Sequence, residues 1–251
     1  MCGIAAIFSY SSKSPLVDRN ELRLIRDEMT VRGPDGFGEW FSENRKVALG
    51  HRRLSIIDLS NNASQPMQTD SGSLVISFNG EIYNYKELRL ALVLKGYQFK
   101  TDSDTEVLLR LYEDSGIAML SKLRGMFAFC LWDSSKNAML IARDPYGIKP
   151  VYYADDGVTV RVASQVKALS RSKRVSKERD LAGIAGFYLF GSVPDPRTTF
   201  SDIRPLSAGS YVWVNSQGIS KESNYFSVSD IFFEAECNPL QLSFDEAQEG
   251  I

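Results

Sequence analysis

Histidine is almost absent from this sequence, because His51 is the only one among 251 residues. A zinc or iron site built from several histidines is therefore excluded, and the three cysteines lack the spacing of a zinc motif. A Ser–His–Asp triad would have to use His51 as its only imidazole. If the protein carries out acyl transfer, we expect its general base to come from another group.

Cysteine is also scarce, and the three positions Cys2, Cys130 and Cys237 lie far apart. An odd number without framework spacing favours a reducing compartment over a disulfide scaffold. The longest apolar run, residues 126–132, has seven residues, whereas a membrane span needs about 20. No basic-then-apolar signal peptide begins the chain. We therefore expect a cytoplasmic protein without a membrane partner.

Neither sign of charge dominates, since 29 basic and 31 acidic side chains give a net charge of −2. Such a balance offers no basic field to hold a nucleic-acid backbone, so we expect no nucleic-acid partner. The sequence is 43% hydrophobic, which suffices for the core of one large domain or two small ones.

Apolar runs of strand length dominate the pattern, with helices grouped between them. Helices are expected after the capping residues Asp18, Asn84 and Asp104, and over residues 180–190. Consecutive strands joined by tight turns favour antiparallel sheets covered by helices, in a layered sandwich with two sheets inside. The strands are predicted at residues 3–8, 47–50, 74–78, 97–101, 126–132, 138–142, 151–153 and 158–163, with a late hairpin at 211–219.

Cys2 follows the initiator methionine and is the first candidate for chemistry. Removal of Met1 would give one residue both a thiol, of pKa about 8.5, and an α-amine, of pKa about 8. That amine could take the thiol proton and later protonate a leaving group, which supplies a general base without histidine. The alternative is that Cys2 is a small apolar residue at the start of a buried strand.

Three polar segments each allow a structural and a functional interpretation. Asn79-Gly80 follows an apolar strand, and is either a strand exit or a pair of oxyanion donors. Arg52 and Arg53 are either a solvated edge or a carboxylate-binding guanidinium. Asp104 is either a helix cap or a ligand for an ammonium group.

The order and combination of these segments resemble the class II glutamine amidotransferases, and most closely the glutaminase half of asparagine synthetases. The resemblance covers nearly the whole chain. It is carried by Cys2-Gly3-Ile4, Arg32-Gly33-Pro34-Asp35, His51-Arg52-Arg53-Leu54-Ser55-Ile56, Asn79-Gly80-Glu81-Ile82-Tyr83-Asn84, Ser103-Asp104-Thr105-Glu106, Leu123–Ala128, Arg143–Pro150 and Gly191–Thr198.

The resemblance implies an α+β fold, namely the four-layer αββα sandwich of the N-terminal-nucleophile hydrolases. It also implies that processed Cys2 attacks the side-chain amide of L-glutamine, that Asn79 and Gly80 form the oxyanion hole, and that the glutamyl thioester is hydrolysed. His51 has no catalytic assignment, and no metal site is implied. The substrate-binding positions by resemblance are Arg53 for the α-carboxylate, Glu81 and Asp104 for the α-amino group, and Leu54, Ser55, Ile56 and Ile57 for the pocket wall.

The sequence departs from a two-domain asparagine synthetase at its far end, because it contains no Ser-Gly-Gly-x-Asp-Ser loop. We expect an amidotransferase domain over residues 2–240 and, from the capping box Ser243–Glu246, the start of a linker helix over 241–251. ATP and Mg²⁺ are then expected only on an absent synthetase domain, acting in trans or lost by truncation, with aspartate as the acceptor. A homodimer, a non-catalytic glutamine-binding or partner-docking domain, and an acylase for another amide stay open.

Overall fold

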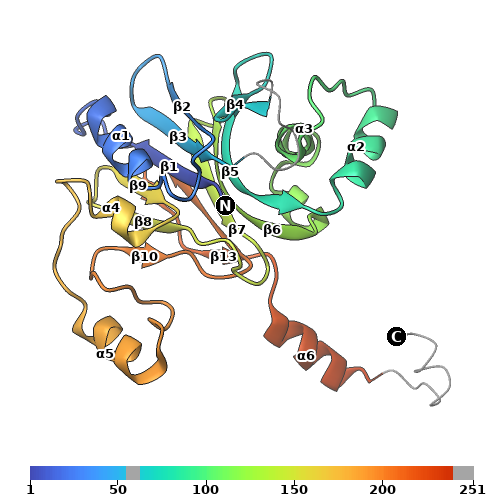
Figure 1. Cartoon of the computed structure of the whole chain (residues 1–251). Coiled ribbons are helices and arrows are strands. Elements are labelled where there is room, and N and C mark those ends of the chain that lie inside the picture. The colour runs from blue at the N-terminus through green and yellow to red at the C-terminus, as the bar shows by residue number, and fades with distance from the viewer. Residues whose placement is uncertain (55–62, 240–251) are drawn as a thin grey trace.

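Two antiparallel sheets, packed face to face, form the centre of the computed structural model, which describes residues 1–54 and 63–239 (Figure 1). The first sheet has the order β10-β8-β9-β1-β3-β2, and the second has the order β12-β11-β7-β6-β5-β4, with β13 paired to β11. The strands are β1 (Gly3–Phe8), β2 (Gly36–Phe41), β3 (Val47–Arg53), β4 (Met67–Gln68), β5 (Leu74–Ile82), β6 (Gly125–Asp133), β7 (Ala138–Arg143), β8 (Tyr152–Asp155), β9 (Val160–Ala163), β10 (Arg204–Pro205), β11 (Ser210–Asn215), β12 (Gly218–Ile219) and β13 (Ser223–Asn224).

Helices cover the outer face of each sheet. The first sheet packs against α1 (Arg19–Asp27) and α4 (Val166–Leu169). The second packs against α2 (Tyr85–Leu94), α3 (Asp104–Ser115) and the 3₁₀ helix η2 (Gly116–Lys122). Two further helices, α5 (Leu181–Phe190) and α6 (Val228–Cys237), project from the body (Figure 1). The four-layer αββα arrangement is confirmed, with the two sheets inside as the strand pattern predicts.

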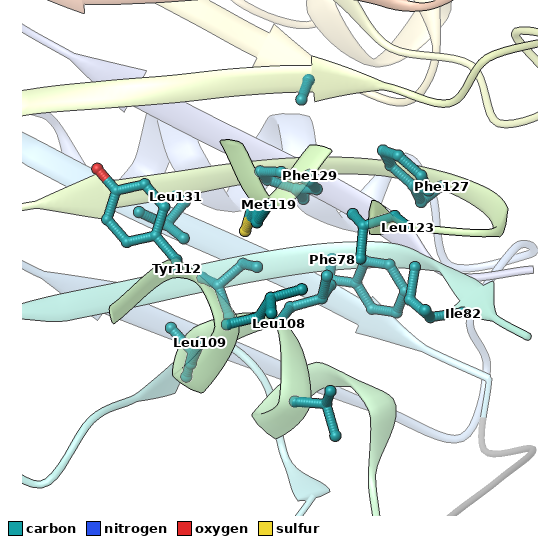
Figure 2. Packing of buried hydrophobic residues seen from close by; sticks show 14 of the residues in the cluster. Phe78, Ile82, Leu108, Leu109, Tyr112, Met119, Leu123, Phe127, Phe129 and Leu131 are labelled. Atoms are coloured by element: carbon teal, nitrogen blue, oxygen red, sulfur yellow. The ribbon is translucent and has the colours of Figure 1, made fainter. Parts of the chain in front are cut away.

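Alternation along the central strands explains why both faces of each sheet are buried. The even-numbered residues of β1 face the core between the sheets, whereas Ala5 and Ile7 face the helices of the first sheet. On β6 the odd-numbered residues pack against α3 and η2, and Figure 2 shows Phe129 and Leu131 beside Met119. Successive side chains of a strand point to opposite faces of the sheet, so a sheet covered on both faces needs apolar residues at both odd and even positions.

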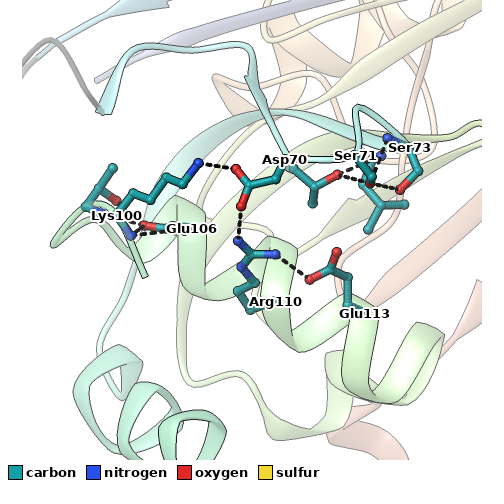
Figure 3. Close-up of polar contacts among 10 residues, drawn as sticks. Asp70, Ser71, Ser73, Lys100, Glu106, Arg110 and Glu113 are labelled. Atoms are coloured by element: carbon teal, nitrogen blue, oxygen red, sulfur yellow. Dashed lines mark hydrogen bonds and ion pairs between the residues drawn. The ribbon is translucent and has the colours of Figure 1, made fainter. Parts of the chain in front are cut away.

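Residues 97–101 are not a strand, which corrects the prediction from their alternating pattern. Both carboxylate oxygens of Glu106 accept the backbone N–H of Lys100, at 2.9 and 3.0 Å, and one also accepts that of Thr101 at 2.7 Å. Lys100 and Arg110 also bind Asp70 (Figure 3). A buried side chain therefore supplies the acceptors that a neighbouring strand would have given.

Two predicted helix caps are wrong. Asn84 precedes α2, but its carboxamide binds the backbone of Lys122 and Arg124 at 3.0 Å each and caps nothing. Ser103, not Asp104, caps α3 by accepting the N–H of Glu106 at 3.3 Å. The Asp104 carboxylate is therefore available for another role.

Within the described ranges, no helix is long and apolar enough to cross a membrane. The described chain extends through α6 to residue 239, and the predicted linker helix over 241–251, with its capping box, lies outside it. The predicted domain boundary at residue 240 stays a prediction.

Candidate active site

Cys2 lies at the start of β1, half-buried at the mouth of a pocket. The backbone N–H of Leu54 donates to its Sγ at 3.3 Å, and the thiol donates to the Leu54 carbonyl at 3.5 Å. Nε of Arg32 donates to the Cys2 carbonyl at 3.1 Å. Both main-chain and side-chain atoms of Cys2 are therefore held in one orientation.

Burial raises the pKa of the Cys2 thiol above its ordinary value. The Leu54 N–H, the chain's terminal amine, and the cations Arg53 and Lys149 oppose that increase. Because the thiolate is the nucleophile, a thiol in this environment reacts only if a base removes its proton or a nearby cation stabilises the thiolate.

The open edge of β5 presents a backbone donor to the same pocket. Asp144 engages both the N–H and the C=O of Phe127, at 3.2 and 2.7 Å, so Phe127 cannot bond its register partner Gly80. In an antiparallel ladder the Gly80 N–H must then point away from β6, like those of Phe78 and Ile82. Those two neighbours donate to Gln65 Oε1 at 2.7 Å and to Asp104 Oδ2 at 3.0 Å. The Gly80 N–H faces the pocket between them.

Asn79 and Gly80 lie inside β5, not at a strand exit, which corrects the prediction from the Asn-Gly dipeptide. The Asn79 side chain is 1% exposed, and its Nδ2 has no hydrogen-bond partner among the described residues. A Cβ at Gly80 would lie 2.3 Å from the Met126 carbonyl, so only glycine fits. A buried, unpaired amide is costly unless a ligand completes it.

Alternation along β3 places His51 and Arg53 on one face of the sheet and Arg52 on the other. Nε2 of His51 lies 3.0 Å from the Phe78 carbonyl and joins the two sheets, and burial lowers the His51 pKa to about 4. Arg52 lies on the face covered by α1 and binds Asp27 at 2.7 Å. Arg53 lines the pocket. The structure thus places Arg53 rather than Arg52 at the candidate site, and His51 outside it.

Two acids line the same pocket as the cations. Glu81, from β5, and Asp104, from α3, line the pocket. Burial raises the pKa of Asp104 to about 6, with a further increase from the Glu81 charge and opposition from the Ile82 N–H. Two neighbouring carboxylates, one of them buried, form a site that a cationic group would neutralise.

The structure brings seven of the ten predicted site residues into one pocket: Cys2, Arg53, Leu54, Asn79, Gly80, Glu81 and Asp104. Ser55, Ile56 and Ile57 lie outside the described residues. Arg32, Gln65 and Lys149 are not identified as site residues from the sequence. Arg32 and Lys149 lie in segments that carry the family resemblance, which is the signal that could have found them. Among the described residues no group of three His, Cys, Asp or Glu side chains could hold a metal ion.

Comparisons with known proteins agree with this geometry. The sequence matches the glutamine amidotransferase domain family over residues 1–226. Glutamine-hydrolysing asparagine synthetase 1 of Bacillus subtilis (strain 168) is 40% identical over 247 residues, covering 98% of this chain and 37% of that protein. Asparagine synthetase B of Escherichia coli (strain K12) is 41% identical over 201 residues, covering 80% and 35%.

A solved glutamine phosphoribosylpyrophosphate amidotransferase from B. subtilis has the same fold, with a TM-score of 0.65 and 22% identity over 90% of this chain and 50% of the other. The fold is that of the amidotransferases of the N-terminal-nucleophile class. The chain belongs to the class II glutamine amidotransferases, and it spans little more than a third of the length of the asparagine synthetases to which it is similar.

Proposed function

We propose that this domain hydrolyses the side-chain amide of L-glutamine to glutamate and ammonia through a thioester on Cys2. The observation that carries the proposal is the meeting of four features in one pocket. These are the Cys2 thiol, the inward Gly80 N–H, the unpaired Asn79 amide, and the presence of both cations and carboxylates. An amide hydrolase that recognises a zwitterion needs each of them.

The charges define the orientation of the substrate. The guanidinium of Arg53 binds the α-carboxylate, and Glu81 with Asp104 binds the α-ammonium group. The side-chain carbonyl carbon then lies against Cys2. Burial raises the pKa of Asp104 in the free protein. A positive group bound beside Glu81 and Asp104 lowers that pKa again and favours the ionised carboxylate.

The reaction has two steps, acylation of Cys2 and hydrolysis of the thioester, and each passes through a tetrahedral intermediate at the same carbon. Sγ of Cys2 bonds to the amide carbon, the oxygen takes the negative charge between Asn79 Nδ2 and the Gly80 N–H, and the C–N bond breaks as the nitrogen is protonated. Water then attacks the thioester carbon, and the C–S bond breaks to return the thiol. The base is the α-amine of Cys2, which requires removal of Met1, a residue at the pocket mouth.

The ammonia passes to an ATP-dependent synthetase domain, with aspartate as the acceptor and ATP and Mg²⁺ bound only there. The support is that the similar B. subtilis and E. coli proteins are named glutamine-hydrolysing asparagine synthetases and are far longer than this chain.

The direct test is the release of glutamate and ammonia by wild type, Cys2→Ala and Cys237→Ser. Cys237 is exposed on α6, far along the chain from the pocket, so its substitution is the matched control. We expect Cys2→Ala to lose at least about three orders of magnitude of activity, as a variant that retains Met1 should, while Cys237→Ser stays unchanged. Undiminished turnover by Cys2→Ala would overturn the proposal. Turnover of another amide but not glutamine would instead indicate an acylase.

A further inference from the structure

The segment Arg143–Pro150 joins β7 to β8, and the reaction above gives it no part. The buried Asp144 organises it, because Oδ1 accepts the N–H of Tyr146 and Ile148 at 3.1 and 2.9 Å. Oδ2 accepts the N–H of Lys149 at 2.8 Å and that of Phe127 in β6 at 3.2 Å. One carboxylate thus ties the loop to the strand that adjoins β5.

Arg143 holds the other side of the loop. Its guanidinium donates to the carbonyls of Gly147 at 2.7 Å, Lys149 at 3.0 Å and Leu206 at 2.7 Å. Gly147 has a φ of +65°, and a Cβ there would lie 3.1 Å from the guanidinium. The loop therefore has little freedom, and its backbone fixes where the Lys149 side chain begins.

Lys149 is only 6% exposed, and it lines the same pocket as Cys2. Among the described residues its ammonium has no hydrogen-bond or ion-pair partner. The packing of the loop, and not an ion pair, therefore holds this side chain in the pocket that also contains the Cys2 thiol. In a partly buried pocket its positive charge acts on the thiol with less screening than in water.

We propose that Lys149 is a positioning residue that stabilises the thiolate form of Cys2 and so sets the pH at which the nucleophile becomes reactive. The inference rests on the proposed function only in taking Cys2 as the nucleophile. A cation in a partly buried site favours an adjacent anion more strongly than it would in water. In agreement with the geometry, the Lys149 charge lowers the pKa of the Cys2 thiol against the effect of burial.

Other charges also face Cys2, and the test has to separate them. Arg53 comes from β3 and Arg32 from the loop after α1. The terminal amine acts on the thiol directly, and Glu81 and Asp104 line the same pocket. Arg53 and the two acids are assigned to substrate binding, so only a measurement without glutamine isolates the effect of Lys149.

The experiment measures the rate of Cys2 alkylation by iodoacetamide from pH 6 to 10, in which the thiolate displaces iodide. Carbamidomethylated Cys2 is quantified by mass spectrometry in a Cys237→Ser background, because Cys237 is exposed whereas Cys130 is buried. Lys149→Met is compared with Lys149→Arg and with Lys177→Met, which removes an exposed lysine. Urea midpoints of all variants are measured in parallel.

We expect Lys149→Met to move the midpoint of the pH profile upward by about half to one unit, and to slow alkylation at pH 7 about three- to tenfold. Lys149→Arg should stay close to wild type, and Lys177→Met should match it. The urea midpoint of Lys149→Met should be equal to or above that of wild type. An unchanged profile in Lys149→Met would overturn the inference, as would a lower urea midpoint without a shifted profile, which would indicate a purely structural role. Because no glutamine is present, failure of glutamine hydrolysis would leave this readout intact.

Discussion

At the scale of single residues, Asp104 lowers stability at neutral pH where it forms part of a binding site. Its pKa is raised from 3.8 to about 6 in the folded state, so the folded protein holds this proton more tightly than the unfolded chain. Its contribution to stability is therefore greatest below pH 3.8 and is lost as the pH rises through about 6. At neutral pH this carboxylate opposes folding by roughly 3 kcal/mol.

Asp104→Asn should therefore be more stable than wild type at pH 7.5, by about 1–3 kcal/mol, but not at pH 4. The amide oxygen can still accept the Ile82 N–H, whereas the charge that we propose to bind an α-ammonium group is gone. We expect KM for glutamine to rise about 10- to 100-fold. Urea unfolding at the two pH values and steady-state kinetics check this, with the exposed Asp202→Asn as control. A variant that is less stable at pH 7.5, with an unchanged KM, would contradict it.

His51 has the opposite dependence on pH. Its pKa is lowered from 6.5 to about 4, because burial disfavours the imidazolium. The unfolded chain therefore binds the proton more tightly, and roughly 3 kcal/mol of stability is lost as the pH falls from about 6.5 to 4. His51→Gln should lose less stability over this window than wild type does, as measured by urea midpoints. Glutaminase activity should fall at most modestly, because His51 joins the sheets through Phe78 and does not line the pocket. Loss of all activity in a folded variant would contradict this and would show that His51 takes part in catalysis.

At the scale of elements, Gln65 connects β5 to α3. Its Oε1 accepts the Phe78 N–H at 2.7 Å, next to Asn79, and its Nε2 donates to Thr105 Oγ1 at 3.3 Å, next to Asp104. The pairing of β4 with β5 stops at Ile76, so no strand covers the edge of β5 at Phe78. The Gln65 side chain satisfies the Phe78 N–H there, and the edge beyond it stays open as part of the pocket. It thereby fixes the position of Asn79, the proposed oxyanion donor, relative to Asp104, the proposed ammonium ligand.

Gln65→Met should leave the Phe78 N–H unpaired and lower kcat/KM for glutamine about 10- to 100-fold. Thr105→Val removes one of the two bonds and should have a smaller effect, largely on KM. Alkylation of Cys2 by iodoacetamide needs no oxyanion hole, so its rate should not change. Gln68→Met, on the exposed side of β4, is the control. Equal losses in kcat/KM and in alkylation would show general damage rather than misalignment.

At the scale of the whole molecule, α5 is an apolar helix outside the four layers. Only Gly183 and Gly186 are buried, while Tyr188 is 83% and Leu189 76% exposed. The double substitution of Tyr188 and Leu189 by serine should change the unfolding free energy by less than about 0.5 kcal/mol. It should reduce binding of a hydrophobic dye and any self-association in sedimentation, with glutamine turnover unchanged. A large loss of stability would show that α5 packs against the body.

The layered fold could be predicted because apolar residues in both phases of a strand require that both faces of its sheet be covered. The site could be predicted in large part because the resemblance fixed the order of its segments. Two features depended on side-chain contacts outside the local pattern and could not be predicted. Glu106 replaces a strand at residues 97–101, and Asp144 turns the Gly80 N–H toward the pocket. The Ser103 cap differs from these two, because Ser103 and Glu106 have the spacing of a capping box and the sequence therefore encodes it.

The measurement that tests the central claim most directly is capture of the acyl intermediate. Wild-type protein lacking Met1 is mixed with glutamine that carries ¹³C in its carbon chain and ¹⁵N in its side-chain amide, and is quenched in acid within milliseconds. We predict that the peptide containing Cys2 gains the ¹³C-labelled glutamyl group without the ¹⁵N, which appears as ammonia. Release of ¹⁵N ammonia with no ¹³C on Cys2 in any quenched sample, or ¹³C on another residue, would contradict the account.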